Sequence, residues 1–368
     1  MRALLLALLA TSQSQTRWTV RTSQGFDALC AINVLSGDPY YVAQYPGDTA
    51  MFNAPRYRDA RAAAQRLKAR LKDGHGMIVS AFLTLILSGG PDSTIDAVVE
   101  SARNPGALEG AYRASPYWSD ESWRIFLDAE PDVVAALDNM RLAGFAADWA
   151  HGFDGDPAVR AAALAERLAT YDVLGEQQRL MGHPLQNGAI EVILLRYSKP
   201  HGIRIQGNRF LTNIGYPVSI VLRNAAHEPL HPPFDGHGPT QAALAELARD
   251  PLLATVVARH NPSYGYTTMD GYLDEDAVQA LEQVVSERLN FARPASERWR
   301  TADDGMHVLA AALYRLMQET GFAANGGTFE TWLGTQVTAG HLSPPEVERL
   351  AASVVGTELI ARWKSLGK

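Results

Sequence analysis

The sequence predicts a mostly helical α+β protein, in which a small antiparallel sheet lies beside one helix and the N-terminal part is helical. Two observations predict this fold class. Alanine-rich stretches with apolar residues at helical spacing fill most of the chain, whereas β-branched residues concentrate in one region, residues 189–215. A chain of 368 residues, of which 46% are hydrophobic and 20% charged, can bury a large core around these elements.

The first segment has the pattern of a signal peptide. Arg2 precedes an apolar run over residues 3–10, and small polar residues follow where a peptidase could cut. We therefore expect a signal peptide over residues 1–14 and a periplasmic or secreted location in a bacterium. The alternative is a cytosolic chain whose first helix is rich in leucine. Cys30 is the single cysteine, which excludes an internal disulfide.

A helical N-terminal lobe is expected over residues 15–182. The apolar run Met77–Ser88 is too short to span a bilayer and predicts a buried helix, so no membrane span is expected in the mature chain. Gly, Pro and Asp residues separate the amphipathic stretches, which cover residues 56–73, 92–103, 131–148 and 156–181.

A second lobe is expected over residues 183–368, unless the two lobes form one continuous domain. Its first segments, "AIEVILLRYS" and "IRIQGNRFLTNIG", predict two strands, and Pro200 and Gly202 between them suggest a hairpin. Pro217 suits the first turn of a helix that runs through apolar residues into His227. Further helices are expected near residues 273–289, 304–320 and 344–364.

The most informative motif is "HEPLH", residues 227–231, which fits the HExxH pattern. His227 and His231 are four residues apart, so both imidazoles can reach one Zn²⁺ ion, and Glu228 can deprotonate a water beside it. Pro229 and the two prolines after His231 predict that the helix ends at or just before His231, on a bent last turn. The alternative is a pair of hydrogen-bonded histidines beside a proline-rich turn.

A catalytic zinc site needs a third protein ligand. One candidate is His237, six positions after His231, as in the HExxHxxGxxH pattern of metzincins, with Met269 in the place of their Met-turn. The sequence departs from that pattern at Phe234, where metzincins have the glycine that turns the chain. His237 is therefore the alternative third ligand.

The segments "HEPLHPPFD" and "YLDEDAVQAL", with "FDALCAINVLSGDPYY" nearer the N-terminus, resemble those of uncharacterised exported bacterial proteins of the gluzincin type of HExxH zinc metallopeptidase. The resemblance covers scattered motifs within residues 25–290, and only HExxH is specific. It implies a zincin-like lobe in which Glu275 is the third zinc ligand. Asp274 would cap the helix that carries it, near the favourable N-terminal end of the helix dipole.

The resemblance implies a zinc-dependent peptidase that acts on a peptide or protein, with Glu228 as general base on a zinc-activated water. Tyr264, Tyr266 and Tyr272 are candidate donors to the oxyanion. Candidate partners for the histidines are Asp235 and Asp276.

The alternative function is that of a non-catalytic exported helical binding protein, or of a degenerate metallopeptidase. The bent motif and the long helical N-terminal part favour it. A nucleic-acid partner is not expected, because the net charge is −7 and basic residues form no stripe.

Overall fold

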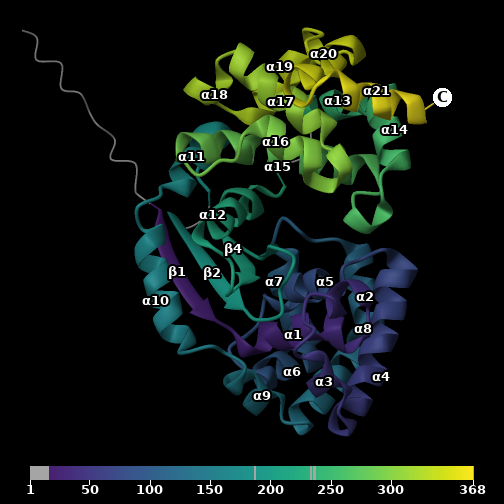
Figure 1. Cartoon of the computed structure of the whole chain (residues 1–368), viewed down its shortest axis with the longest axis vertical. Helices are drawn as coiled ribbons and strands as arrows, with labels where there is room; N and C mark the ends of the chain where they lie inside the picture. The colour runs from purple at the N-terminus through teal and green to yellow at the C-terminus, as the bar shows by residue number, and fades with distance from the viewer. Residues whose placement is uncertain (1–15, 186–187, 233, 235–237, 368) are drawn as a thin grey trace, which may run out of the picture.

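The computed structural model describes residues 16–185, 188–232, 234 and 238–367. The chain forms two lobes, one built on the N-terminal helices and the sheet, the other on the C-terminal helices, with α12 and α15 where they meet (Figure 1). The expected mostly helical α+β class is confirmed. The expected signal peptide, His237 and Asp235 lie outside the described residues. Within the described ranges, no helix has the length and apolar character needed to cross a membrane.

The elements up to the sheet are β1 (Arg17–Thr22), α1 (Gln24–Leu35), α2 (Pro39–Val42), α3 (Thr49–Asn53), α4 (Arg58–Leu67), α5 (Val79–Leu87), α6 (Ile95–Arg103), α7 (Pro105–Arg113), α8 (Asp120–Leu142), α9 (Phe145–His151), α10 (Pro157–Leu168) and α11 (Val173–Met181). The remaining strands and the helix after them are β2 (Ala189–Leu195), β3 (Ile203–Ile205), β4 (Arg209–Asn213) and α12 (Val218–His227). The C-terminal helices are α13 (Gly238–Leu247), α14 (Pro251–Arg259), α15 (Met269–Arg288), α16 (Ala295–Thr301), α17 (Val308–Glu319), α18 (Phe322–Asn325), α19 (Phe329–Thr338), α20 (Pro344–Val355) and α21 (Thr357–Leu366).

The sheet is mixed, so the prediction of an antiparallel sheet was wrong. Its order is β1-β2-β4-β3, with β1 parallel to β2, β2 parallel to β4, and only β3 antiparallel to β4. After β2 the chain crosses to the far edge, forms β3, and turns back at Gly207, whose φ is 78°, to place β4 in the middle. The hairpin is therefore at Gly207 and not at Pro200 and Gly202, because positive φ at a tight turn favours glycine.

β1 was not expected, because residues 16–180 read as helical. It is an edge strand contributed by the N-terminal segment, and it pairs in parallel with β2 over six residues. A six-residue strand with partly exposed side chains has a weak sequence pattern, and a partner 172 residues away decides its conformation.

Both faces of the sheet are buried, which explains why its central strands read as continuous apolar runs. Alternate side chains point to opposite faces. Ile190, Val192 and Leu194 pack into the core that includes α12 and α15, whereas Ile193 and Leu195 pack against the core of the N-terminal helices. The sheet therefore joins the two cores and fixes the start of α12 between them.

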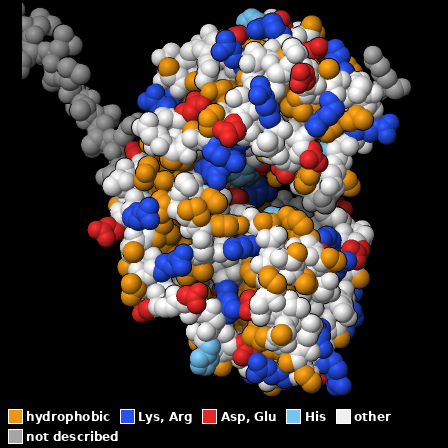
Figure 2. Space-filling model, in the orientation of Figure 1, with side chains coloured by type: hydrophobic (Ala, Val, Ile, Leu, Met, Phe, Trp, Pro, Cys, Tyr) orange, Lys and Arg blue, Asp and Glu red, His pale blue; other side chains and the backbone are white. Residues whose placement is uncertain are grey.

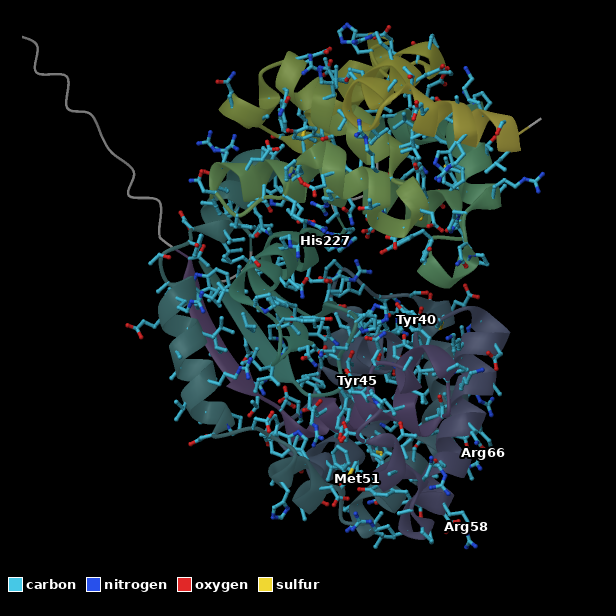
Figure 3. All side chains as sticks on the ribbon, viewed as in Figure 1. Tyr40, Tyr45, Met51, Arg58, Arg66 and His227 are labelled. Carbon is cyan, nitrogen blue, oxygen red and sulfur yellow. The ribbon has the colours of Figure 1, made fainter. Side chains whose placement is uncertain are left out.

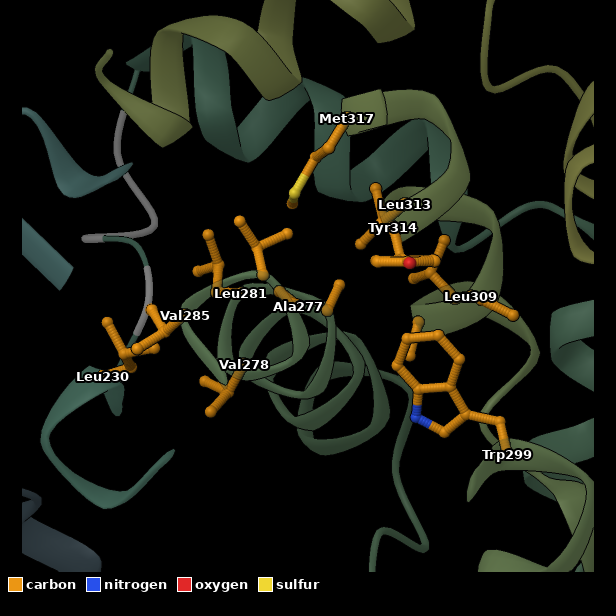
Figure 4. Packing of buried hydrophobic residues seen from close by; sticks show 14 of the residues in the cluster. Leu230, Ala277, Val278, Leu281, Val285, Trp299, Leu309, Leu313, Tyr314 and Met317 are labelled. Carbon is orange, nitrogen blue, oxygen red and sulfur yellow. The ribbon is translucent and has the colours of Figure 1, made fainter. Parts of the chain in front are cut away.

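Helix α15 is the centre of the C-terminal core. Figure 4 shows its Ala277 and Leu281 on the side that faces α17, whereas Val278 and Val285 point to other sides of the helix, and all four belong to one buried core. The same helix buries the acidic side chains Glu275, Asp276 and Glu282. Buried carboxylates need hydrogen-bond or charge partners, so the polar stripe of α15 indicates a site.

Helix α12 ends where the prolines predicted. Its last α-helical residue is His227, residues Glu228–Leu230 form a single 3₁₀ turn, and His231 is extended. Pro229 cannot donate to the carbonyl of Ala225. The buried Gln177 of α11 instead donates its side-chain amide to the carbonyl oxygens of Ala225, at 3.1 Å, and Ala226, at 3.0 Å. The bent turn therefore keeps its backbone acceptors bonded.

Replacing Gln177 with alanine is expected to lower the free energy of unfolding by about 1–3 kcal/mol, because two buried carbonyl groups lose their donor. Urea denaturation followed by circular dichroism measures the loss. The matched control is Gln178→Ala on the same helix, whose side chain is more exposed. Equal unfolding midpoints for the two variants would contradict the role of Gln177 in the bent turn.

Candidate metal centre

Two histidines four residues apart meet a glutamate from a distant segment of the chain where α12 and α15 cross. The Nε2 atom of His231 lies 3.1 Å from Nε2 of His227 and 3.4 Å from Oε2 of Glu275, and Nε2 of His227 lies 3.6 Å from the same oxygen. The His231 and Glu275 side chains are 8% and 4% exposed, so the meeting point is shielded from bulk water. Figure 3 shows His227 on the side of α12 that faces the gap between the lobes.

These distances fit a metal ion. Donor atoms of a tetrahedral zinc site with bonds of 2.0–2.1 Å are ~3.3 Å apart, and the three distances here lie around that value. Two unprotonated imidazole nitrogens 3.1 Å apart need a proton or a cation between them. The trio is a group that could hold a metal ion, and three protein donors leave the fourth tetrahedral position to water or substrate.

Each of the three side chains is oriented by a polar partner. Nδ1 of His231 donates to Oδ2 of Asp274 at 2.8 Å. Nδ1 of His227 faces Oε2 of Glu282 at 3.4 Å, and Gln279 donates to Oε1 of Glu275 at 2.7 Å. Carboxylate partners on the outer nitrogens fix the imidazole tautomers, so that both Nε2 lone pairs face inwards.

The N-terminal lobe also holds the motif in place. The hydroxyl of Tyr117 donates to the backbone carbonyl of His231 at 3.1 Å, and the Arg204 guanidinium lies 5.0 Å from the centre of the Tyr117 ring. The extended backbone of His231 is thereby fixed from the opposite side. The bend that the prolines impose is thus part of the geometry that brings the two imidazoles together.

The electrostatics favour positive charge at this centre. Burial alone lowers the pKa of His227, but the Glu275 carboxylate raises it well above the usual range of histidine. Burial alone raises the pKa of Glu275, yet the two histidines hold it well below its usual range. Glu275 is therefore ionised at neutral pH. Protons and metal ions compete for the same nitrogens, because histidine binds a metal in its neutral form.

Glu228 lines the same cavity as His227 and Glu275, which has a volume of about 360 Å³. Figure 2 shows the surface hollowed between the two lobes, with acidic, basic and histidine side chains in the hollow. Gly202, in the loop before β3, lies directly over the carboxylate: a Cβ atom there would be 2.7 Å from Cγ of Asn224 and 2.8 Å from Oε1 of Glu228. This close approach requires glycine.

If the trio holds a metal ion and this cavity supports hydrolysis, a Gly202→Ala variant is expected to keep the ion and to lose up to about 10²-fold of the activity, because the added methyl displaces Glu228 by a few tenths of an ångström or more. Steady-state hydrolysis and metal content measure the two effects. Gly47→Ala is the matched control, since a Cβ atom at Gly47 meets nothing within 4 Å. Unchanged activity in Gly202→Ala would show that Glu228 is free to move aside.

Of the three candidate tyrosines, Tyr266 lines the cavity and the other two do not. The Tyr264 hydroxyl donates to Asp304 and the Tyr272 hydroxyl to the carbonyl of Met306, both away from the cavity. Tyr266 lines the cavity, and its hydroxyl interacts with Glu275. Burial, followed by the nearby Glu275 carboxylate, raises the pKa of Tyr266 well above its usual range. Tyr266 therefore keeps its proton and can donate a hydrogen bond.

Two expectations about α15 need correction. The helix begins at Met269 with Thr268 as its N-cap, so Asp274 and Glu275 lie in its second turn and Asp274 is no cap. Asp276 does not contact the ligand histidines. Its Oδ1 atom instead accepts a hydrogen bond of 2.6 Å from Nδ1 of the buried His307.

The partners of the trio were missed in the sequence. Asp274 precedes Glu275 on α15 but orients His231, while Arg298 of α16 pairs with Glu282. The spacing of Glu275, Gln279 and Glu282 could have revealed a polar stripe in an otherwise apolar helix, because positions i, i+4 and i+7 share one face. The pairing across helices has no such sequence pattern.

Replacing Asp274 with alanine is expected to weaken zinc binding by roughly 10–100-fold, the usual effect of removing a carboxylate that orients a ligand histidine. Competition with a fluorescent zinc chelator measures the affinity. Asp270→Ala, an exposed acidic position in the first turn of the same helix, controls for loss of charge. The same affinity in both variants would remove Asp274 from the site.

Comparison with known proteins gives no assignment for this chain: no family model, no curated protein and no solved structure matches it.

Proposed function

We propose that this protein is a zinc-dependent peptidase. The observation that supports the proposal is the inward-facing trio of His227, His231 and Glu275, at distances near those of a tetrahedral zinc site. Glu228 lines the same cavity as His227 and Glu275. Imidazole and carboxylate donors suit Zn²⁺, and a nearby carboxylate that is not a ligand suits general-base catalysis.

Each step of peptide hydrolysis would depend on a particular side chain of the site. Bound zinc would supply the Lewis acidity that lowers the pKa of a water and polarises a carbonyl group. Glu228 would accept a proton from the attacking water and pass it to the leaving amine. The Tyr266 hydroxyl has one proton, which here serves Glu275, so it would turn from that carboxylate to donate a hydrogen bond to the oxygen of the scissile carbonyl as negative charge develops on it. Asp274 and Glu282 would hold the two imidazoles in place.

The test uses the full chain, purified with zinc and dialysed to remove loose metal. Elemental analysis should give one zinc per chain, and hydrolysis of labelled casein or of a peptide mixture should stop when zinc is removed by a chelator and return when it is restored. The absence of stoichiometric zinc contradicts the proposal. Stoichiometric zinc without turnover on any peptide supports a binding protein or degenerate peptidase instead.

A further inference from the structure

One face of α12 continues the cavity beyond the metal centre. Ile220, Arg223, Asn224, His227 and Glu228 all line it, at positions i, i+3, i+4, i+7 and i+8 of a single helical face. The Asn224 side chain donates to Thr212 of β4 at 3.0 Å and anchors this face to the sheet. The cavity therefore has room for a molecule at the metal centre to extend along α12 by one further turn.

Arg223 is the unusual residue of this face. It is partly buried in the cavity wall, and its Nε atom donates to the carbonyl of Ser219, one turn earlier, at 3.3 Å. Across the described residues its guanidinium makes no ion pair. Its remaining N–H groups are available to a ligand in the cavity, and a guanidinium can bind a carboxylate through two parallel hydrogen bonds.

The other arginine of the cavity shows the contrast. Arg298 is 6% exposed and is bonded to Glu282, Gln279 and Gln283. Arg298 and His227 both contact Oε2 of Glu282, whereas its Oε1 has no hydrogen-bond partner among the described residues. Glu282 acts on Arg223 only through its charge, without an ion pair in the part of the chain that the structure describes.

The cavity around Arg223 holds charges of both signs, since Arg298 lines it together with several carboxylates, Glu228, Glu275, Glu282 and Asp303. Burial, followed by repulsion from the nearby Arg293, lowers the pKa of the Arg223 guanidinium, with Arg298 acting in the same direction and Glu282 against it. An anion bound beside Arg223 relieves this repulsion. The planar guanidinium fork matches a carboxylate in a bidentate pair.

We propose that Arg223 is a specificity residue that binds a carboxylate group of the substrate, one helical turn from the metal centre. The inference rests on the proposed function. Residues four apart on a helix are ≈ 5–6 Å apart, so the bound carboxylate belongs to the substrate residues next to the scissile bond. Either the C-terminal carboxylate of a peptide or an acidic side chain provides this chemistry.

The experiment measures equilibrium binding to the zinc-loaded protein carrying Glu228→Gln, so that turnover does not interfere. Four N-terminally fluorescein-labelled peptides are compared by anisotropy. The first pair is a neutral peptide with a free C-terminal carboxylate and the same peptide as an amide. The second pair is an amidated peptide with one internal aspartate and its asparagine counterpart. The pair that shows a preference identifies the source of the carboxylate.

With Arg223 present, the carboxylate form of one pair is expected to bind roughly tenfold or more tightly than its neutral counterpart. Arg223→Gln should reduce that preference to less than about twofold, and Arg223→Lys should restore part of it, because lysine keeps the charge but not the fork. Arg249→Gln, at an exposed arginine in the turn after α13, should leave the preference unchanged.

Equal binding within both pairs overturns the inference, and so does a preference that survives Arg223→Gln in protein with unchanged zinc content. If Arg223→Gln does not fold, the comparison of acid with amide in the intact protein and the partial effect of Arg223→Lys decide the question. If the wild type hydrolyses peptides but shows no preference for a carboxylate, the peptidase proposal holds and the inference about Arg223 fails. If the protein prefers the carboxylate form but hydrolyses no peptide, the inference about Arg223 holds, the peptidase proposal fails, and the protein binds carboxylates without catalysis.

Discussion

Zinc binding is expected to fail in a Glu275→Ala variant that remains folded. The change removes one of three donors and leaves the two imidazoles facing each other without the carboxylate that balances a cation between them. The loss should exceed the roughly 10–100-fold expected for the partner Asp274, because a direct ligand is removed. Elemental analysis after zinc-replete purification measures it, with circular dichroism to verify the fold.

The control that makes this result decisive is His237→Ala. If Glu275 is the third ligand, His237→Ala keeps stoichiometric zinc. The reverse pattern, zinc retained without Glu275 and lost without His237, would select the metzincin-like alternative. Glu275→Gln adds a second comparison, since it keeps the shape and the oxygen atom but removes the charge.

Hydrolysis of peptides is expected to fall by at least about 10²–10⁴-fold in Glu228→Gln, with zinc content unchanged. The amide has nearly the same shape as the carboxylate but cannot accept the proton of the attacking water. Because Glu228 lines the cavity without belonging to the ligand trio, its loss should affect turnover and not metal binding. Steady-state kcat and zinc stoichiometry on the same preparation measure both.

Glu246→Gln, an exposed glutamate on α13, controls for the change in net charge. Equal kcat in Glu228→Gln and the wild type would exclude Glu228 as the general base. A parallel loss of zinc and activity would instead place Glu228 among the residues that maintain the metal centre.

Local patterns in the sequence predicted a large part of this structure. The concentration of β-branched residues located β2, β3 and β4 within residues 189–215, and the apolar run at Met77–Ser88 predicted the buried helix α5. Pro217 and the later prolines predicted both ends of α12, because proline favours a helix start and prevents its continuation. Each of these features depends on residues that are adjacent or one helical turn apart.

Such local patterns could not predict which strands pair when they are far apart in the sequence. The six-residue strand β1 and the parallel alignment of β2 with β4 depend on partners that only the folded chain supplies. Local patterns also could not predict that Gln177 supplies the hydrogen bond that Pro229 cannot make, or that Gly202 packs so closely over Glu228 that it has no room for a Cβ atom. None of these contacts produces a periodic pattern in the sequence.

By itself, the sequence determined the composition of the site: two histidines and a glutamate at HExxH spacing, and a helix that must end beside them because of its prolines. The tertiary structure decided which carboxylate joins them. Glu275 lies within 3.4 Å of His231 because α15 crosses α12 at this point, driven by the apolar side chains that both helices bury. It likewise decided that Asp274 orients His231 while Asp276 turns away to His307, since residues two apart on a helix point in different directions.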